Sequence, residues 1–295
     1  MMLSLVQTSQ NRRQELIRFI NSLNNQIGID FSQIQLIFID QGDNLDLFGK
    51  LNPQIKFDYI KHHLCSLSHA RNIGLCHVSG EYIGFPDDDC WYEKNTLKNI
   101  IDFFSEGYQG VVAKGTDENG ILTNDFPSEK KLITMYNHCG AISYTIFLKF
   151  IPSLRFDEKI GVGSPFGLSS GEETDYLLQS LYQLGTKMLY DPTIIVHHPS
   201  NGIGLFKDSI HKQYEYARGW GYLLYKHKYP FSIILKSFLR PCGGIIVFAL
   251  NFKFNRVKRS FSLLKGRIEG FLIAMKMAKV GVIIPVYNVC ISIWE

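Results

Sequence analysis

The sequence predicts an α/β fold, with a mostly parallel central sheet flanked by helices and a helical, basic extension at the carboxyl end. Two observations support this prediction. Short apolar runs alternate with amphipathic helical patterns over the first 115 residues, which is typical of a parallel sheet. The run IQLIFID (34–40) is continuously apolar, as expected for a strand covered on both faces.

The individual elements follow from periodicity and punctuation. Apolar or alternating runs predict strands at 3–8, 34–40, 56–60, 81–85 and 187–199. Helical spacing of apolar residues predicts helices at 11–26, 69–78, 95–104 and 172–185. We expect Ser68 to cap the helix at 69–78. The stretch 116–170 contains many Gly and Ser residues and reads as loops.

The composition indicates a globular protein of one large domain with an appendage. The chain has 295 residues, of which 45% are hydrophobic and 20% charged, and these values argue against disorder. Six cysteines are scattered without a CxxC pair, which suits reduced thiols in a cytoplasm better than disulfides or a zinc site. The first 13 residues lack the pattern of a secretory signal.

Charge is distributed unevenly along the chain. The segment 205–279 contains 15 Lys and Arg residues and 3 acidic residues, a net charge of +12, whereas the whole chain carries +4 and the remainder therefore −8. Basic residues alternate there with long aliphatic and aromatic runs. This pattern favours an anionic membrane surface as partner over a nucleic acid.

Acidic residues follow two of the predicted strands. Asp40 closes the second strand, and three consecutive aspartates, Asp87 to Asp89, follow the fourth. Ligands of parallel sheets bind beyond the carboxyl ends of the strands. Adjacent carboxylates repel each other unless a cation compensates them, although a solvated acidic turn is an alternative interpretation. An EF-hand is excluded because the required Gly and distant Glu are missing.

Five motifs occur in order along the chain, namely TSQN (8–11), FIDQGDN (38–44), SHARNIGL with GEYIGFPDDD (68–89), GEETDYLLQSLYQLG (171–185) and YDPTIIVHHP (190–199). Together they resemble the inverting glycosyltransferases of family 2, which have the Rossmann-like GT-A fold. The resemblance covers about residues 3–200. Each motif alone is weak, whereas their order and spacing together are specific.

The resemblance implies a DXD metal site. Asp89 and Asp87 would hold Mn²⁺ or Mg²⁺, and Asp88 would face the ribose or the phosphates of the donor. Hard divalent cations prefer such carboxylate oxygens and commonly bridge to phosphates. His198 matches the metal-contacting histidine of the family. Because neighbouring residues of a strand face opposite sides, only one of His197 and His198 can reach the metal, and we favour His198.

The resemblance also assigns donor-binding residues, with departures from the family. They are Thr8, Asn11, Asp40, Gln41, Arg71, Asp87 and Asp88. Gln41 stands where the family commonly has a second Asp that contacts the base. A glutamine amide both donates and accepts, so it can still read the edge of uracil, and a UDP-sugar is the favoured donor. An alternative role for Arg71 is a surface ion pair.

Glu173 matches the position of the catalytic base, where the family more often has Asp. The resemblance implies that its carboxylate takes the proton from the acceptor hydroxyl. Asp175 and Glu172 are alternative bases, and Glu172 is also explained as a charge in the first turn of a helix. Asn137 and His138 lie where the family lines its acceptor cleft, although core packing is an equally good explanation.

We predict three regions: a GT-A catalytic domain at 1–204, a basic amphipathic helical region at 205–279, and an apolar tail at 280–295 that resembles the start of a second GT-A domain. The uncharged stretch 241–251 is too short to span a bilayer and fits an interfacial position, and a buried helical hairpin is the alternative. We therefore expect a cytoplasmic protein that is peripheral on the inner face of the cell membrane.

These observations predict a metal-dependent inverting glycosyltransferase. It would move a sugar from a nucleotide-diphosphate donor to a polyprenyl-diphosphate-linked saccharide in bacterial surface-polysaccharide assembly (O-antigen, capsule or exopolysaccharide). One alternative is a sugar nucleotidyltransferase, which normally has a glycine-rich phosphate loop that is missing from the first strand region. The other is a non-catalytic, metal-dependent carbohydrate-binding protein, a class that is usually all-β.

Overall fold

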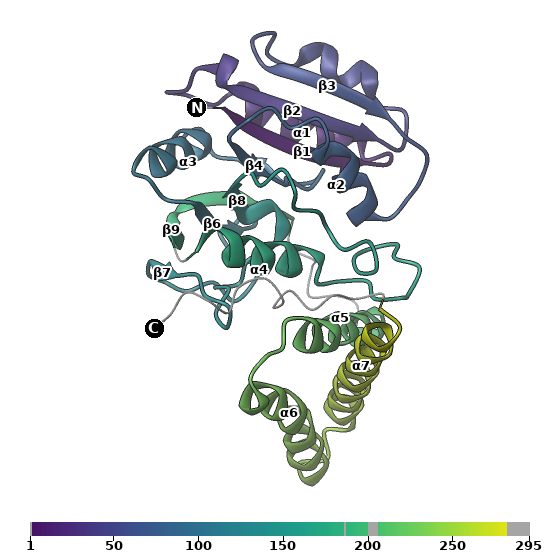
Figure 1. The fold of residues 1–295 in the computed structure, drawn as a ribbon. Coiled ribbons are helices and arrows are strands. Elements are labelled where there is room, and N and C mark those ends of the chain that lie inside the picture. Colours follow the sequence, from purple (N-terminus) through teal and green to yellow (C-terminus); the bar gives the residue numbers. More distant parts are fainter. Residues whose placement is uncertain (1, 186, 200–205, 282–295) are drawn as a thin grey trace. The chain divides into compact units, whose positions relative to one another are not determined.

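A computed structural model describes residues 2–185, 187–199 and 206–281 (Figure 1). The chain forms two compact units. We call them the sheet unit (Met1–Phe156 with Tyr176–Asn201) and the helical unit (Asp157–Asp175 with Gly202–Glu295). The predicted tail at 280–295 lies almost wholly outside the described residues, and the predicted domain boundaries stay a prediction.

The sheet unit is built on one mixed sheet with the strand order β3-β2-β1-β4-β8-β6-β9-β5, in which β7 also pairs with β9. The strands are β1 (Leu3–Ser9), β2 (Ile34–Asp40), β3 (Lys56–Lys61), β4 (Tyr82–Gly84), β5 (Trp91–Tyr92), β6 (Gly110–Thr116), β7 (Lys131–Leu132), β8 (Ile146–Lys149) and β9 (Met188–His197). The pairs among β1 to β4 and the pair β6–β9 are parallel, and the other described pairs are antiparallel. The predicted α/β class is therefore correct.

Helices cover both faces of the sheet. They are α1 (Arg13–Asn24), α2 (Leu67–Leu75), α3 (Thr96–Ser105) and α4 (Glu172–Leu184), with short 3₁₀ helices η1 (Phe31–Gln33), η2 (Leu45–Lys50) and η3 (Ser143–Thr145). In β2, Leu36 and Phe38 join the core cluster that includes the apolar residues of α1 and α3. Ile37 and Ile39 point to the opposite face, toward Gly74 of α2. All seven residues of β2 are buried, as its continuous apolar run predicts.

Two details of the prediction are wrong, and each has a local cause. The α2 helix begins at Leu67, and its cap is Ser66, whose hydroxyl accepts a hydrogen bond from the His69 amide at 3.3 Å. Ser68 is instead buried inside the first turn. The stretch 116–170 contains β8, which pairs antiparallel with both β4 and β6 and so joins the two halves of the sheet. This strand is too short to show a clear alternation of apolar and polar residues.

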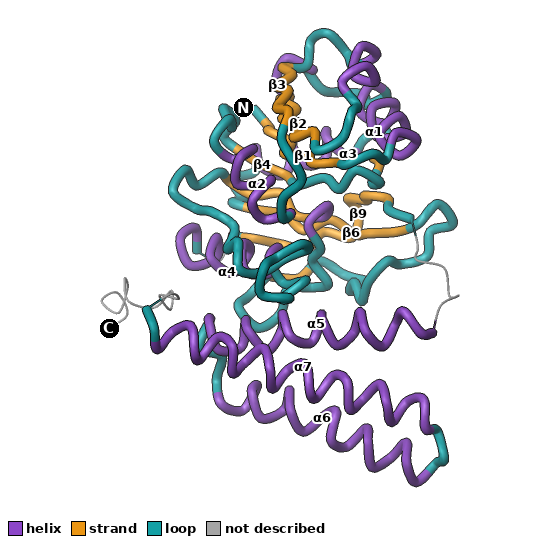
Figure 2. The backbone as a smooth tube through the Cα atoms, turned by 90° about the vertical axis from the view of Figure 1, so that its right-hand side faces the viewer, coloured by secondary structure: helices purple, strands orange, loops and turns teal. Residues whose placement is uncertain are grey.

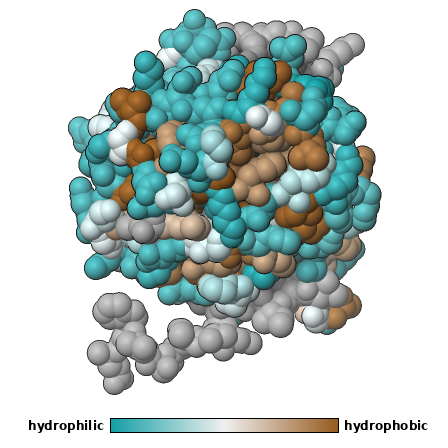
Figure 3. All heavy atoms as spheres, turned by 90° about the horizontal axis from the view of Figure 1, so that it is seen from above, coloured by the Kyte–Doolittle hydropathy of each residue, from teal (hydrophilic) through white to brown (hydrophobic). Residues whose placement is uncertain are grey.

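The parallel strands place their carboxyl ends at one edge of the sheet. Ser9 of β1 is in register with Asp40 of β2, and β4 runs parallel to β1 on its other side. The residues that follow β1, β2 and β4 therefore meet at this edge, where the sequence places its acidic residues. Viewed from the top of Figure 1, the visible face is largely hydrophilic with smaller hydrophobic areas between the polar ones (Figure 3).

The helical unit contains three long helices, α5 (Phe206–Lys226), α6 (Phe231–Leu250) and α7 (Phe254–Lys279) (Figure 2). The axes of α5 and α7 approach closely because glycines face backbone: a Cβ on Gly266 would lie 2.5 Å from the Tyr214 oxygen, and one on Gly270 1.9 Å from the Arg218 oxygen. These pairs keep a constant offset, so the two helices run parallel. In contrast, α6 and α7 are joined by a short turn and form an antiparallel hairpin.

The α6 helix is longer than the uncharged stretch that the sequence suggested. It continues through Lys236, Arg240 and the internal Pro241. Among the described residues it is the one helix that is long and apolar enough to cross a membrane by length and composition, with 20 residues and a mean hydropathy of 1.8. Only 6% of its most apolar window is buried inside the structure.

Gly74 provides a test of the packing of α2 on the sheet. A Cβ at this position would lie 2.5 Å from a Val6 methyl group and 2.8 Å from an Ile39 methyl group. We expect Gly74→Ala to reduce the free energy of unfolding by about 1–3 kcal/mol, because inserting a methyl group into a packed core forces its neighbours to shift. Urea denaturation of both proteins measures this difference.

The matched control is Gly49→Ala, because no atom lies within 4 Å of a Cβ built there. This variant should unfold with nearly the wild-type midpoint. Equal stability of the two alanine variants would contradict the tight packing of α2 against β1 and β2.

Candidate functional site

The acidic triplet after β4 is held by residues from several elements. Asp87 accepts hydrogen bonds from Arg71 (3.1 Å) and from the Ser143 hydroxyl (3.0 Å). Arg71 comes from α2, and its side chain is 2% exposed. A buried guanidinium requires a carboxylate partner, so this ion pair fixes the position of Asp87 relative to α2.

The other two aspartates share a cation from the start of α1. Arg12 forms ion pairs with Asp88 and with Asp89. Asp88 also accepts a hydrogen bond from the Ser9 hydroxyl at 2.6 Å, and Asp89 lies 2.9 Å from Nε2 of His198. Three adjacent carboxylates are thus compensated by three separate cationic groups, counting Arg71, Arg12 and His198.

Asp87, Asp89 and His198 form a group that can hold a divalent metal ion. Their ligand atoms all lie within 4.8 Å of one another. Two carboxylates and an imidazole are a donor set that suits Mn²⁺, and carboxylate oxygens also suit Mg²⁺. The geometry does not distinguish between the two metals, whereas it does bring together the three residues that the sequence predicts as ligands.

The orientation of the His198 ring fits this role. Nδ1 lies 2.9 Å from the Pro199 carbonyl oxygen, which only accepts, so Nδ1 carries a proton. Nε2 is therefore the nitrogen that faces Asp89 and is available to a metal. The ring also stacks on Tyr144, with centroids 4.7 Å apart and an interplanar angle of 13°. His197 points to the other face of β9, where its ring stacks on Trp91 and Nε2 lies 3.3 Å from Glu93.

Burial and neighbouring charges set the protonation of these groups. Burial raises the pKa of Asp88 to about 6, although Ser9 and Arg12 act in the opposite direction. Burial also opposes ionisation of Asp89, yet the hydrogen bond and charge of His198, together with Arg12, lower its pKa below the usual value. The same contact with Asp89 raises the pKa of His198 despite its burial. The contact between His198 and Asp89 thus favours the charged form of both groups.

The predicted donor residues on β1 and β2 are brought together by the loop that follows β2. The Gln41 side chain donates to the Thr8 hydroxyl (2.8 Å) and accepts from the Cys65 amide (2.8 Å). Asn11 accepts a hydrogen bond from the Asp43 amide at 3.3 Å. Both atoms of the Gln41 amide are therefore engaged within the chain, which fixes the shape of this loop.

Asp40 organises the same loop from within. It is fully buried, and its oxygens accept from the amides of Gly42 and Asn44 (both 2.9 Å) and from the Tyr59 hydroxyl (3.0 Å). Burial would raise the pKa of Asp40, but these hydrogen bonds lower it below the usual value. The carboxylate stays ionised and acts on the backbone of the loop.

The predicted bases lie in the helical unit, at the start of α4. Glu172 is buried and Glu173 is half-buried. Asp175 is fully buried, and its two oxygens lie 2.9 Å from the Lys226 ammonium and 2.7 Å from Nε2 of His227. Burial opposes its ionisation, yet the Lys226 charge and the His227 hydrogen bond keep the pKa of Asp175 below the usual value.

Lys226 also contacts a second buried carboxylate, Asp157, at 2.7 Å. Burial alone would lower the pKa of Lys226, but the two aspartates raise it above the usual value. Burial likewise opposes ionisation of Asp157, and Lys226 lowers its pKa well below the usual value. These ion pairs therefore contribute stability between about pH 4, the ordinary carboxyl range, and about pH 10, the ordinary lysine range.

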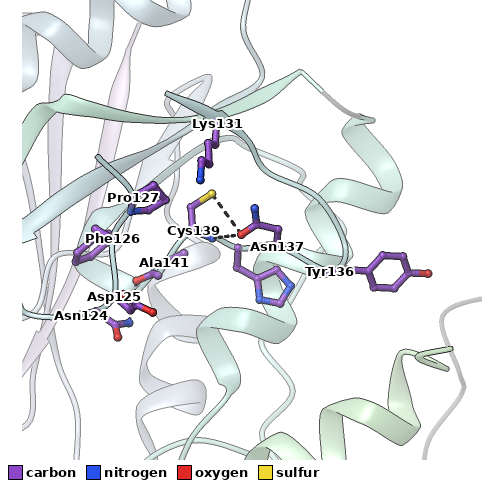
Figure 4. Close-up of a pocket in the computed structure, with 11 residues that line it drawn as sticks. Asn124, Asp125, Phe126, Pro127, Lys131, Tyr136, Asn137, Cys139 and Ala141 are labelled. Atoms are coloured by element: carbon purple, nitrogen blue, oxygen red, sulfur yellow. Dashed lines mark hydrogen bonds between the residues drawn. The ribbon is translucent and has the colours of Figure 1, made fainter. Parts of the chain in front are cut away.

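Asn137 and His138 line a polar cavity of about 560 Å³ in the sheet unit. Asn137 Oδ1 accepts a hydrogen bond from the Cys139 amide at 3.2 Å, with Cys139 in the left-handed region at φ 52°. Figure 4 shows Asn137 and Lys131 beside this thiol, whereas the Tyr136 ring points away. The remaining lining residues are Asn124, Asp125, Phe126, Pro127, Gly140 and Ala141. The cavity has room for a sugar ring.

Several residues of the site were not predicted. Arg12 follows Asn11 in the run NRR, in which the sequence does not distinguish one arginine from the next. Ser143 and Tyr144 belong to η3, inside the stretch that reads as loop. Tyr144 is further positioned by the Thr123 hydroxyl, 2.7 Å from its phenol oxygen. Ser143 and Tyr144 reach the acidic triplet because η3 directly precedes β8, which pairs with β4.

Comparison with known proteins gives a consistent result. Residues 4–166, more than half of the chain, match the family model described as Glycosyl transferase family 2. The chain is 30% identical over 180 residues to the minor teichoic acid biosynthesis protein GgaB of Bacillus subtilis (strain 168). The match covers 54% of this chain and 20% of GgaB, so the chain spans about a fifth of that relative.

Solved structures share the fold at low sequence identity. S. aureus TarS has a TM-score of 0.56 and 14% identity, covering 94% of this chain and 55% of TarS. A TarS structure in complex with UDP-GlcNAc has a TM-score of 0.55 and 14% identity, covering 95% and 92%. The mannosyltransferase PcManGT from Pyrobaculum calidifontis, in complex with GDP-Man and Mn²⁺, has a TM-score of 0.52 and 10% identity, covering 96% and 76%.

The contact of Arg12 with the triplet predicts an effect on metal affinity. The side chain of Arg12 is 53% exposed, so its charge is partly screened by solvent. We expect Arg12→Ala to tighten Mn²⁺ binding by about two- to five-fold, or about 0.5–1 kcal/mol, because a competing cation is removed from Asp88 and Asp89. Isothermal titration with Mn²⁺ in the absence of nucleotide measures this change.

Arg13→Ala is the matched control. Arg13 pairs with Asp46 at 2.6 Å and donates to the Asp43 carbonyl oxygen, away from the triplet. Its removal should leave the Mn²⁺ affinity within the error of the titration. Weaker Mn²⁺ binding by the Arg12 variant would instead mean that Arg12 holds the aspartates in place for the metal.

Proposed function

Because the chain belongs to glycosyl transferase family 2, we propose that it transfers a sugar from a UDP-sugar to a lipid-linked saccharide, with inversion at the anomeric carbon, during assembly of a teichoic-acid-type or related surface polymer. The observation that carries this proposal is the group formed by Asp87, Asp89 and His198 at the carboxyl edge of the sheet. The polymer class is supported by the similarity to GgaB, and the nucleotide by the UDP-GlcNAc complex of TarS. A sugar nucleotidyltransferase or a non-catalytic binding protein accounts less well for the family match.

In this proposal the donor diphosphate binds beside the acidic triplet. Asp87, Asp89 and His198 would hold Mn²⁺ or Mg²⁺, and the ion would supply positive charge that stabilises the diphosphate as a leaving group. Arg71 keeps Asp87 in position through its buried ion pair. Arg12, which pairs with Asp88 and Asp89, is placed so that its guanidinium could bind a phosphate of the donor.

The loop after β2 forms the nucleoside side of the donor site. Thr8 and Gln41 are hydrogen-bonded to each other, and Asn11 is bonded to the following turn. Asp40 fixes the backbone of this loop through its hydrogen bonds. Thr8, Gln41 and Asn11 therefore occupy fixed positions beside the base and the ribose of the donor. Asp88, whose carboxylate lies at the same edge, accepts from a ribose hydroxyl.

Glu173 is the proposed base. It removes the proton from the attacking acceptor hydroxyl, so that the oxygen attacks the anomeric carbon while the bond to the diphosphate breaks on the opposite face. Glu173 is half-buried, whereas Asp175 is fully buried. Asp175 is less suited to this role because both of its oxygens are bonded to cationic side chains. Glu172, Asn137 and His138 are proposed on the acceptor side.

The helical unit is proposed to bind an anionic membrane surface, where a polyprenyl-linked acceptor resides. Exposed apolar side chains lie along α6, in the turn after it and in the first part of α7, namely Phe231, Leu239, Ile246, Leu250, Phe252, Phe254 and Phe261. Basic residues are interspersed among them, namely Lys236, Arg240, Lys253, Arg256, Lys258 and Arg259. Apolar and basic side chains on one hairpin suit insertion at the interface of an anionic leaflet. The protein would then act at the cytoplasmic face of the cell membrane.

The role of Glu173 is tested by Glu173→Gln, which keeps the shape and removes the proton acceptor. A thermal-shift screen of UDP-sugars with Mn²⁺ first identifies the donor, because a ligand of the folded state raises the apparent stability. We expect turnover of that donor to fall by about 10²–10⁴-fold, with the affinity for UDP and Mn²⁺ unchanged within twofold.

Glu158→Gln serves as control, since it removes an exposed carboxylate from the same segment. It should retain wild-type turnover. If the Glu173 variant keeps normal turnover but binds UDP more weakly, Glu173 binds the donor and is not the base.

The membrane proposal is tested with Phe252→Asn combined with Phe254→Ser. Asn suits position 252 because Phe252 has φ 53°, in the left-handed region. The wild-type protein should sediment with vesicles that contain anionic lipid and dissociate as salt rises, whereas the variant should bind about tenfold more weakly because two exposed rings are lost.

Tyr136→Ser, which removes an exposed ring from the sheet unit, is the control and should bind vesicles like the wild type. Equal binding to neutral and anionic vesicles would contradict the electrostatic part of the proposal. Resistance to both salt and alkaline carbonate would show that α6 crosses the bilayer.

A further inference from the structure

One face of α5 binds the segment 157–175, which ends in the first turn of α4. Near the end of α5, Lys226 contacts both Asp157 (2.7 Å) and Asp175 (2.9 Å), and His227 lies 2.7 Å from the second oxygen of Asp175. One turn earlier, the Tyr222 hydroxyl donates to Asp157 at 2.7 Å. The two ends of the segment 157–175 are thus bonded to the same short stretch of one helix.

The middle of the segment contacts α5 one turn earlier still. Arg218 donates to the Gly167 carbonyl oxygen at 2.8 Å. Gly219 lies against Ser170, where a Cβ would be 2.2 Å from the carbonyl oxygen. Gly171, at φ 98°, packs against Leu223. Because residues four apart share a helix face, the contacts at 218, 222 and 226 form one continuous line.

The charged groups in these contacts are buried. The side chains of Lys226 and Asp157 are each 7% exposed, and that of Asp175 is 0% exposed. Loss of one partner from such a cluster leaves a buried charge without compensation, which is strongly destabilising. The cluster therefore restricts the segment to one arrangement on α5.

An adjacent face of α5, which shares Arg218 with the first, contacts α7. Besides the two glycines of α7 described above, Gly221 of α5 faces the Arg267 oxygen, which would lie 2.2 Å from a Cβ. Such close backbone approach leaves little freedom for one helix to slide along the other. The helix α5 thus connects the segment 157–175 rigidly to the hairpin that carries the proposed membrane surface.

We infer that Asp175 is a positioning residue that fixes the first turn of α4 on α5 and thereby sets the direction in which Glu173 points. Asp175 follows Glu173 by two residues, about 200° around the helix axis. Fixing the Asp175 side chain therefore fixes the rotation of this turn and the direction of Glu173. This inference rests on the proposed function, because Glu173 is assigned there as the base.

Asp175→Asn tests the inference in the full-length protein, because it keeps the shape of the side chain and removes its charge. We expect hydrogen exchange of the backbone amides in 157–175 to become at least about tenfold faster, with exchange in β1 and β2 unchanged. Turnover of the donor identified by the screen should fall by about ten- to a hundred-fold, as expected when a catalytic group is displaced. The affinity for UDP with Mn²⁺ should stay within twofold.

Two further variants make the result unambiguous. Tyr222→Phe removes one hydrogen bond to Asp157 and keeps the ring, so it should raise exchange near 157–160 even if the Asp175 variant does not fold. Asp191→Asn removes a buried carboxylate of the sheet unit that pairs with the exposed Lys130, and it should leave exchange in 157–175 and turnover unchanged.

Wild-type exchange in 157–175 for both Asp175→Asn and Tyr222→Phe would overturn the inference. Faster exchange without a loss of turnover would also overturn it, provided that Glu173→Gln is inactive. Full activity of Glu173→Gln would refute the proposed base instead, and the exchange data would then still show whether α5 holds the segment.

Discussion

Three adjacent carboxylates at the end of β4 repel one another, and much of the sheet unit is arranged to compensate that repulsion. Two like charges 4 Å apart cost about 1 kcal/mol in water and about 4 kcal/mol near a protein surface. Arg71, Arg12 and His198 approach the triplet from α2, from the start of α1 and from the end of β9. A charge cluster that one strand end cannot tolerate alone is therefore stabilised by elements far apart in the sequence.

The same cluster explains why the edge of the sheet is suited to an anionic ligand together with a cation. Burial raises the pKa of Asp88 to about 6, whereas contacts with His198 and Arg12 lower that of Asp89. The two neighbouring carboxylates thus differ in basicity although they share a turn. Asp89 and Asp87 are suited to bind a divalent ion. Asp88 is better suited to a hydrogen bond with a neutral hydroxyl group.

The proposed catalytic groups are distributed over two compact units. Asp87, Asp89 and His198 belong to the sheet unit, and Glu173 belongs to the helical unit. Within the helical unit, the line of contacts from Arg218 to His227 joins the segment of Glu173 to α5, and glycines join α5 to α7. Under the proposed function, the unit proposed to bind the membrane would also carry the proposed base.

By itself, the sequence determined the elements whose signal is local. Three features can be recognised from the sequence alone: the apolar run of β2, the helical spacing of apolar residues in α1, and the acidic triplet after β4. The order of the family motifs can also be recognised, and it points to Asp87, Asp89 and His198. These features depend on neighbours in the chain, and the resemblance assigns them a common chemistry.

Only the tertiary structure decided the rest, because it depends on contacts between distant residues. Strand β8 has four residues, and its place between β4 and β6 follows from the hydrogen bonds of those strands. The choice of Arg12 over Arg13 as partner of the triplet follows from how α1 begins beside β4, and the burial of Asp175 follows from α5, about 50 residues later in the chain. A residue's type sets which contacts it can make, whereas long-range packing sets which of them form.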